Sequence, residues 1–111
     1  MADKKDTIAL NGGITEEQIN LWKNKYRKVV EISVKDDDAT FVGYFHRPDM
    51  DTMSAVNKLA KTDEVKSTLV MFDNCWLGGH PVVQEDAIVK MAAIGQLASV
   101  FNSCIAELKN L

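Results

Sequence analysis

The chain has 111 residues, of which 46% are hydrophobic and 26% are charged. This length is typical of one domain and this apolar content is typical of a chain that forms a core, so two ordinary domains and disorder of the whole chain are both disfavoured. The formal net charge is −3, with 13 basic residues spread among 16 acidic ones. Nucleic-acid binders concentrate Lys and Arg on one face, so no nucleic-acid partner is expected.

The first 13 residues are expected to be a flexible N-terminal tail, followed by a single α+β domain over residues 14–111. Met1–Asp6 is charged and aperiodic, and Asn11–Gly13 is a flexible break. The apolar Ile8 and Leu10 can still dock, so part of the tail can be ordered.

A short amphipathic helix is expected to begin at Thr15. Thr15 and Gln18 form a capping box, in which the hydroxyl and the amide satisfy backbone N–H groups of the first turn. Ile19, Trp22 and Tyr26 then recur at helical spacing and give this helix one apolar stripe.

Two strands are expected next, as a β-hairpin. Val30, Ile32 and Val34 alternate with polar residues, as in a half-buried strand. The segment 40–47 is again β-branched and aromatic, and Asp36–Asp38 supplies turn residues between the two. A lone hairpin is marginal in water, so helices must cover one face.

Three helices complete the predicted α+β fold, the last of them long. The first begins near Asp49, after Pro48, and the second follows Thr62–Asp63. Gly78–Gly79 are interpreted as the stop of that second helix. The last helix is expected over residues 85–108.

The last helix carries the candidate partner-binding surface. Its apolar residues recur seven apart, as in a short seam that pairs helices, and further apolar residues widen the stripe. We predict that this stripe contacts either a client protein or a second copy of the chain. Its residues are Ile94, Leu97, Phe101, Cys104 and Leu108.

No catalytic residue, metal site or cofactor is expected. The acidic run Asp36–Asp38 lacks the spacing, glycine and final glutamate of a calcium loop, so a charged turn explains it better. His46, Asp49 and His80 match no zinc or iron spacing, and they are the sole support for a small-ligand-binding domain. Cys75 lies among apolar residues, which favours a packed thiol over a nucleophile.

Cysteine content and the lengths of the apolar segments indicate the cellular compartment in which the protein is expected. Cys75 and Cys104 are too few for the disulfide framework of a small secreted domain. No signal peptide and no membrane span is recognisable. We therefore expect a cytoplasmic protein with reduced thiols.

Three segments taken together resemble a known family. They are ITEEQINLWKNKYRKVVEISV at 14–34, YFHRPDMDTMSAV at 44–56 and NCWLGG at 74–79. In order and spacing they are similar to small proteins of phage and prophage tail modules, the tail assembly chaperones, over about residues 14–108. The chain departs after Gly79, where such proteins often continue with acidic residues and His80–Val83 stand here.

The resemblance implies a non-enzymatic, protein-binding role. In that family the protein binds the long, apolar tape measure protein and keeps it soluble while the tail tube assembles. The implied partner is that protein or another tail protein, and a second copy of the chain is a further candidate. The implied compartment is the cytoplasm of a bacterial host cell. The alternative is a structural component of the phage particle.

Overall fold

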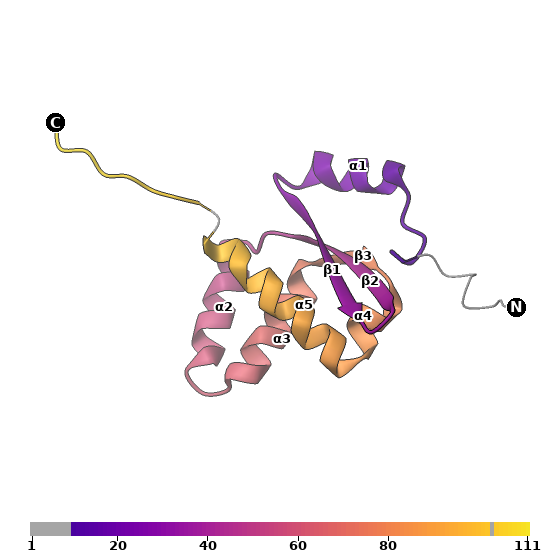
Figure 1. Cartoon of the computed structure of the whole chain (residues 1–111). Coiled ribbons are helices and arrows are strands. Elements are labelled where there is room, and N and C mark those ends of the chain that lie inside the picture. The colour runs from indigo at the N-terminus through magenta and orange to yellow at the C-terminus, as the bar shows by residue number, and fades with distance from the viewer. Residues whose placement is uncertain (1–9, 103) are drawn as a thin grey trace, which may run out of the picture.

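The computed structural model describes residues 10–102 and 104–111, and its architecture is α+β (Figure 1). A helix comes first, a β-hairpin follows, and helices interrupted by one short strand make up the rest, so the predicted fold class is confirmed. The elements are α1 (Glu16–Lys25), β1 (Val29–Asp36), β2 (Ala39–His46), α2 (Met50–Ala60), α3 (Glu64–Cys75), β3 (Trp76–Gly79), α4 (Pro81–Glu85), α5 (Ala87–Ala98) and the 3-10 turn η2 (Ser99–Asn102).

The sheet is antiparallel with the strand order β1-β2-β3. The β1–β2 ladder runs without a bulge from Val29 opposite His46 to Asp36 opposite Ala39. The predicted acidic turn is therefore the hairpin loop, and Asp37 has a positive φ of 55° there. Aspartate tolerates this left-handed conformation better than most residues, which explains an acidic turn without a metal.

The strand β3 corrects the expectation that Gly78–Gly79 merely end a helix. The helix α3 stops at Cys75, and the strand that follows it pairs with β2, Gly79 opposite Gly43 and Gly78 opposite Tyr44. A Cβ atom on Gly79, whose φ is +150°, would lie 2.4 Å from the backbone oxygen of Val42. Glycine is required at this position because two backbones approach there.

One face of the sheet packs against α3, α4 and α5. Aromatic rings link the sheet to α3: the ring centroids of Phe45 and Phe72 are 5.3 Å apart, and those of Phe45 and Trp76 are 5.4 Å apart. The buried residues of this core are Ile32, Val34, Phe45, Met71, Phe72, Cys75, Val83, Val89, Ala93, Ile94 and Leu97.

The helix α1 lies on the other face of the sheet, so the molecule has three layers (Figure 1). The predicted cap is present: Thr15 Oγ1 accepts a hydrogen bond of 3.2 Å from the backbone N–H of Gln18. The Trp22 and Tyr44 ring centroids are 5.8 Å apart, and the Tyr26 ring stacks on His46 at 4.2 Å. No residue of α1 is buried, so these aromatic contacts are its main attachment.

The segment Leu10–Gly13 docks on the sheet, which revises the expected tail boundary. The backbone oxygen of Leu10 accepts a hydrogen bond of 3.0 Å from Val42 N–H. The Asn11 side-chain amide donates to the Ile14 carbonyl oxygen at 2.8 Å and to the Tyr44 hydroxyl at 3.2 Å. The rest of the expected tail, residues 1–9, lies outside the described residues.

The final α-helix is shorter than expected and ends at Ala98. The Ser99 hydroxyl donates to the Gln96 carbonyl oxygen at 2.6 Å, and the chain tightens into η2 before residues 104–111, which have no regular structure. Serine and asparagine near this point compete with the helical backbone for hydrogen bonds. Among the residues whose burial the structure describes, Leu97 is the last one buried in the core, and Val100 packs against it at the edge.

Candidate functional site

The helix α5 is apolar on nearly all sides, yet part of its surface is open to solvent. Within it, Val89, Ala93, Ile94 and Leu97 are buried, whereas Ile88 is 78% and Met91 47% exposed. A helix that is hydrophobic all round is usually buried all round. The exposed residues Ile88, Met91, Ala92, Gly95 and Ala98 form what we call the α5 outer face.

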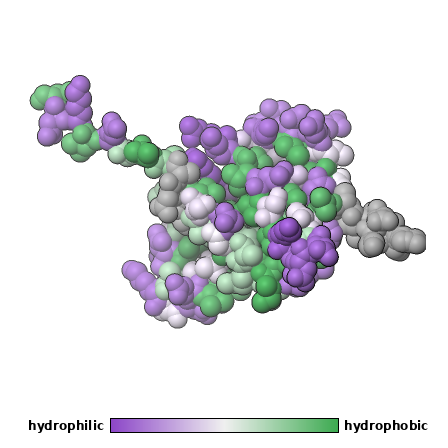
Figure 2. Space-filling model, viewed as in Figure 1, coloured by the Kyte–Doolittle hydropathy of each residue, from purple (hydrophilic) through white to green (hydrophobic). Residues whose placement is uncertain are grey.

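The α5 outer face carries no charge. The one charged residue of α5 is Lys90, whose Nζ lies 4.8 Å from the centroid of the Phe72 ring in the core. White and green atoms run across the front of the body in Figure 2, where Figure 1 places α5. Gly95 adds no side chain, and a Cβ atom there would meet nothing within 4 Å. Exposed uncharged surfaces of this kind mark interaction sites in soluble proteins.

The predicted partner-binding stripe is not one surface. Ile94 is 4% and Leu97 1% exposed, so these two residues hold α5 to the core and are not available to a partner in this fold. Cys104 and Leu108 lie beyond the helix and are exposed. The side chain of Phe101 lies outside the described residues. The sequence prediction included the buried side of this helix, because an all-apolar helix gives no periodic signal for its exposed face.

The C-terminal segment, residues 104–111, is a second exposed apolar feature. It projects away from the body, with green side chains along it (Figure 2). Ile105 is 92% and Leu108 87% exposed, and Leu111 is fully exposed. Their spacing of three residues would place them near one side of a helical turn if the segment became helical on a partner.

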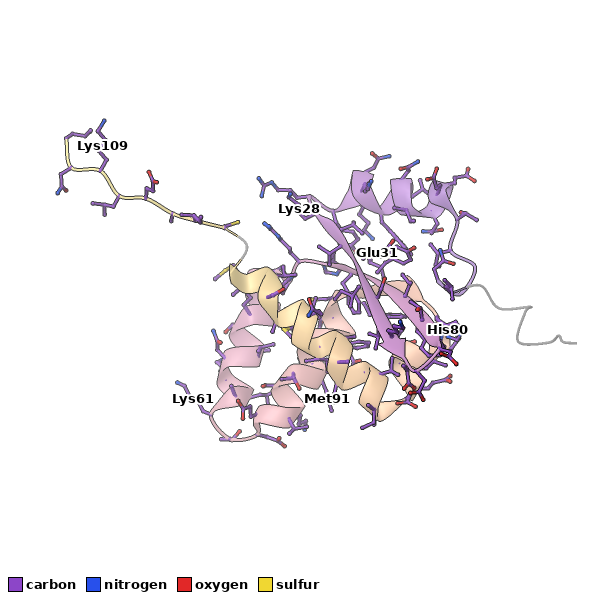
Figure 3. The ribbon with its side chains drawn as sticks, in the orientation of Figure 1. Lys28, Glu31, Lys61, His80, Met91 and Lys109 are labelled. Carbon is purple, nitrogen blue, oxygen red and sulfur yellow. The ribbon has the colours of Figure 1, made fainter. Side chains whose placement is uncertain are left out.

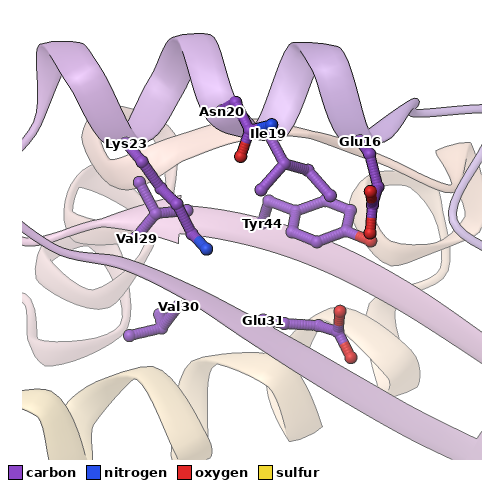
Figure 4. A pocket seen from close by; sticks show the side chains of 8 residues that line it. All are labelled: Glu16, Ile19, Asn20, Lys23, Val29, Val30, Glu31 and Tyr44. Atoms are coloured by element: carbon purple, nitrogen blue, oxygen red, sulfur yellow. The ribbon is translucent and has the colours of Figure 1, made fainter.

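A cleft of about 360 Å³ lies between α1 and the sheet (Figure 4). Ile19, Val29 and Val30 supply its apolar walls, and Glu16, Glu31 and Lys23 carry charge at it. Its volume is within the range of small-ligand sites. Sequence inspection did not find this cleft, because it forms only where α1 crosses two strands and no local pattern marks that crossing.

The residues that suggested a small-ligand domain have separate structural roles, and His80 is labelled in Figure 3. The His46 ring stacks on Tyr26, and Asp49 caps α2 by accepting a 2.8 Å hydrogen bond from Thr52 N–H. That hydrogen bond from Thr52 holds the pKa of Asp49 below its ordinary value. His80 caps α4, its Nδ1 accepting from Val82 N–H at 3.1 Å, and its ring packs on Phe41 near the other end of β2.

No group of three or more His, Cys, Asp or Glu residues that could hold a metal ion occurs in the described part of the chain. Within the same residues, no helix has the length and apolar character needed to cross a membrane.

Cys75 is packed rather than reactive. It is fully buried in the core, and burial raises the pKa of its thiol to about 11. A nucleophilic cysteine needs the opposite, a lowered pKa and an open approach. Cys104 is exposed on the C-terminal segment.

Comparison with known proteins shows the fold. No family model matches the sequence, and no curated protein matches it. A solved structure, the uncharacterised protein rbstp2171 from Bacillus stearothermophilus, matches with a TM-score of 0.58 at 20% sequence identity. The match covers 83% of this chain and 99% of that one. The chain therefore shares its overall fold with that bacterial protein.

Proposed function

We propose that this protein binds an apolar helical segment of another protein and keeps it soluble, and that its client is the tape measure protein of a phage or prophage tail. It acts by contact and catalyses no reaction. The observation that carries this proposal is the α5 outer face, an uncharged helix surface left open on an otherwise well-packed domain.

The α5 outer face has the shape and chemistry to take a client helix. Ile88 and Met91 supply apolar side chains, and methionine adapts to different partners because its side chain is unbranched and flexible. Ala92, Gly95 and Ala98 have small side chains or none, so a second helix can approach closely along α5. The exposed Ile105 and Leu108 of the C-terminal segment offer further apolar contact to the same client.

The identity of the client rests on the sequence resemblance to tail assembly chaperones. The motif residues of that resemblance have structural tasks in this fold, since Asp49 caps α2 and Trp76–Gly79 form β3. They support a shared fold, while the open apolar helix supports a role in binding. A tape measure protein is long, apolar and helical, which is the partner chemistry that an uncharged helix face prefers.

The test is co-expression with the tape measure protein of the same phage or prophage, with and without this chain. We expect a higher soluble yield of the client and co-purification of the two proteins. Met91→Lys should abolish both effects, because a charge would be desolvated in the contact. Val65→Lys on α3 is the matched control, since Val65 is also an exposed apolar residue, at 60%.

Two outcomes count against the proposal. If the client stays insoluble in the presence of the wild-type chain, no chaperone role exists. If Met91→Lys binds as well as Val65→Lys, the contact is not on α5. The alternative role, a structural component of the particle, predicts that the chain is abundant in the mass spectrum of purified virions, where a chaperone should be sparse.

A further inference from the structure

The strand β1 forms one edge of the sheet, and its outward backbone groups are unpaired within the described residues. Val42 N–H bonds to Leu10 and Val42 oxygen accepts from His80 N–H, so Val42 turns away from β1. Opposite residues of an antiparallel ladder alternate between paired and outward-turned backbone groups. Ser33, which lies opposite Val42, therefore turns its N–H and C=O to the open edge.

By the same alternation, the outward groups of β1 belong to Glu31, Ser33 and Lys35. No backbone hydrogen bond to these groups from outside the hairpin occurs among residues 10–102 and 104–111. The strand has eight residues, contains no proline and pairs with β2 without a bulge. A short strand, a proline and a β-bulge are three devices that keep natural edge strands from pairing with another chain, and β1 has none of the three.

The side chains of these three residues make the edge self-complementary in one register. All three are exposed on the sheet face that α1 partly covers. When two copies of β1 pair antiparallel about a two-fold axis at Ser33, Glu31 of each copy lies opposite Lys35 of the other. Opposite charges directly across a ladder stabilise it, and both pairs form at once because the contact is symmetric.

The other registers allowed by the hydrogen-bonding groups are poorer. An axis at Glu31 places two glutamates opposite each other, and an axis at Lys35 places two lysines opposite each other. An axis at Val34 sets Glu31 against Asp37, again with like charges. An axis at Ile32 sets Glu31 against Ser33 and Lys35 against Val29, and its opposite-charge pairs, Lys28 against Asp36, lie only at the ends of β1. Like charges across a ladder are destabilising, so the pattern selects the axis at Ser33.

We propose that a second copy of this chain pairs with β1 along its free edge, joining the two three-stranded sheets into one continuous sheet with its axis at Ser33. The contact uses the backbone groups of Glu31, Ser33 and Lys35 and two Glu31–Lys35 ion pairs. It uses none of the residues of the α5 outer face and does not depend on client binding.

Sedimentation velocity of the full chain over a range of concentrations tests this. The wild type is expected to be a dimer at micromolar concentration. Glu31→Lys and Lys35→Glu should each weaken dimerisation at least about tenfold, because each replaces two attractive pairs by two repulsive ones. The double variant with both exchanges restores opposite charges and should return to wild-type dimerisation. Lys61→Glu, remote from β1 after α2, is the matched control.

Ser33→Pro provides a second, independent variant. It removes the N–H at the centre of the proposed contact, while the bonds from β1 to β2 do not use that group. Circular dichroism should show a folded protein, and sedimentation should show a monomer. A wild-type monomer at 100 µM (about a hundred times a dissociation constant of about 1 µM) overturns the proposal. A dimer that persists in folded Ser33→Pro, or a double exchange that fails to restore dimerisation, also overturns it.

Discussion

At the scale of single residues, glycines determine how closely β3 approaches its neighbouring strand and the helix α1. The backbone of Gly79 lies against that of Val42, and the Trp22 ring lies over Gly78, where a Cβ atom would be 3.0 Å from it. Gly95 is the contrasting case, since it sits in a helix with open space around it. An added side chain would therefore meet close neighbours at the glycines of β3 but not at Gly95 of α5.

Gly79→Ala and Gly95→Ala should change stability in opposite directions. The first forces a side chain onto a positive φ and a backbone oxygen, and should lower the free energy of unfolding by at least about 2 kcal/mol. The second should raise it by about 0.5–1 kcal/mol, because alanine is the better helix former. Urea unfolding followed by circular dichroism measures both. An unchanged midpoint for Gly79→Ala would contradict the close approach of β3 to β2.

The two thiols should differ sharply in reactivity. Cys104 is exposed and Cys75 is buried, with its pKa raised to about 11. A thiol reagent such as Ellman's reagent at pH 8 should modify one thiol quickly and the second only after unfolding. In Cys104→Ser the fast phase should vanish. Fast reaction of that variant would show that Cys75 is accessible.

Because the pKa of Cys75 is raised in the fold, the stability of the protein depends on pH. Between about pH 9 and pH 11 the thiol is ionised in the unfolded chain but stays protonated in the fold. The folded state binds more protons in this window, so its stability is complete below it and falls as the pH rises through it. Urea midpoints should fall less steeply over this window in Cys75→Ala than in the wild type, and identical slopes would contradict the assignment.

At the scale of elements, the sequence predicts α1, the hairpin and the starts of α2, α3 and α5. Local signals specify each of these: the Thr15 cap, the alternation along β1, and the capping aspartates. The strand β3 is not predictable in this way, because Trp76–Gly79 has no alternation and becomes a strand only where β2 lies beside it. The end of α5 depends on where the core ends, which no local pattern encodes.

The helix α1 packs on the sheet without burying any of its residues. Its attachment depends on the Trp22 and Tyr26 rings, and no residue of it is buried. Trp22→Ala should release α1 and speed its amide hydrogen exchange by at least about tenfold, while β1 and β2 keep their protection. Leu21→Ala, on the exposed side of the same helix, should change little. Equal loss of protection throughout the chain would contradict a separable α1.

At the scale of the whole molecule, one aromatic cluster joins the sheet to the helices. Phe45 is fully buried and contacts the rings of Phe72 and Trp76. Phe45→Ala should lower the free energy of unfolding by about 3–5 kcal/mol, a large part of the total for a domain of this size. Thermal unfolding of Phe45→Ala and the milder Phe45→Leu measures this, and a near-native midpoint for the alanine variant would contradict the role of the cluster.

The candidate functional surfaces are defined only by the packing of the whole molecule. The apolar residues of α5 are evident in the sequence, but which of them face outward depends on how α3 and β1 cover the helix. The charges Glu31 and Lys35 are likewise ordinary alternating residues until the strand order places β1 at an edge. Sequence patterns therefore identify the elements, and the packing of distant segments determines which surfaces stay open.

The position of Trp22 over Gly78 also affects the order of events during synthesis. The helix α1 leaves the ribosome early, but β3 follows about 56 residues after Trp22, which takes about 3–11 s at translation rates of about 5–20 residues per second. During that interval the Trp22 ring can reach Tyr44 but lacks the β3 backbone at Gly78 that it contacts in the complete fold. A nascent chain stalled before Gly78 should therefore expose this tryptophan to solvent and to ribosome-associated chaperones, whereas one stalled well after β3 has left the exit tunnel should not.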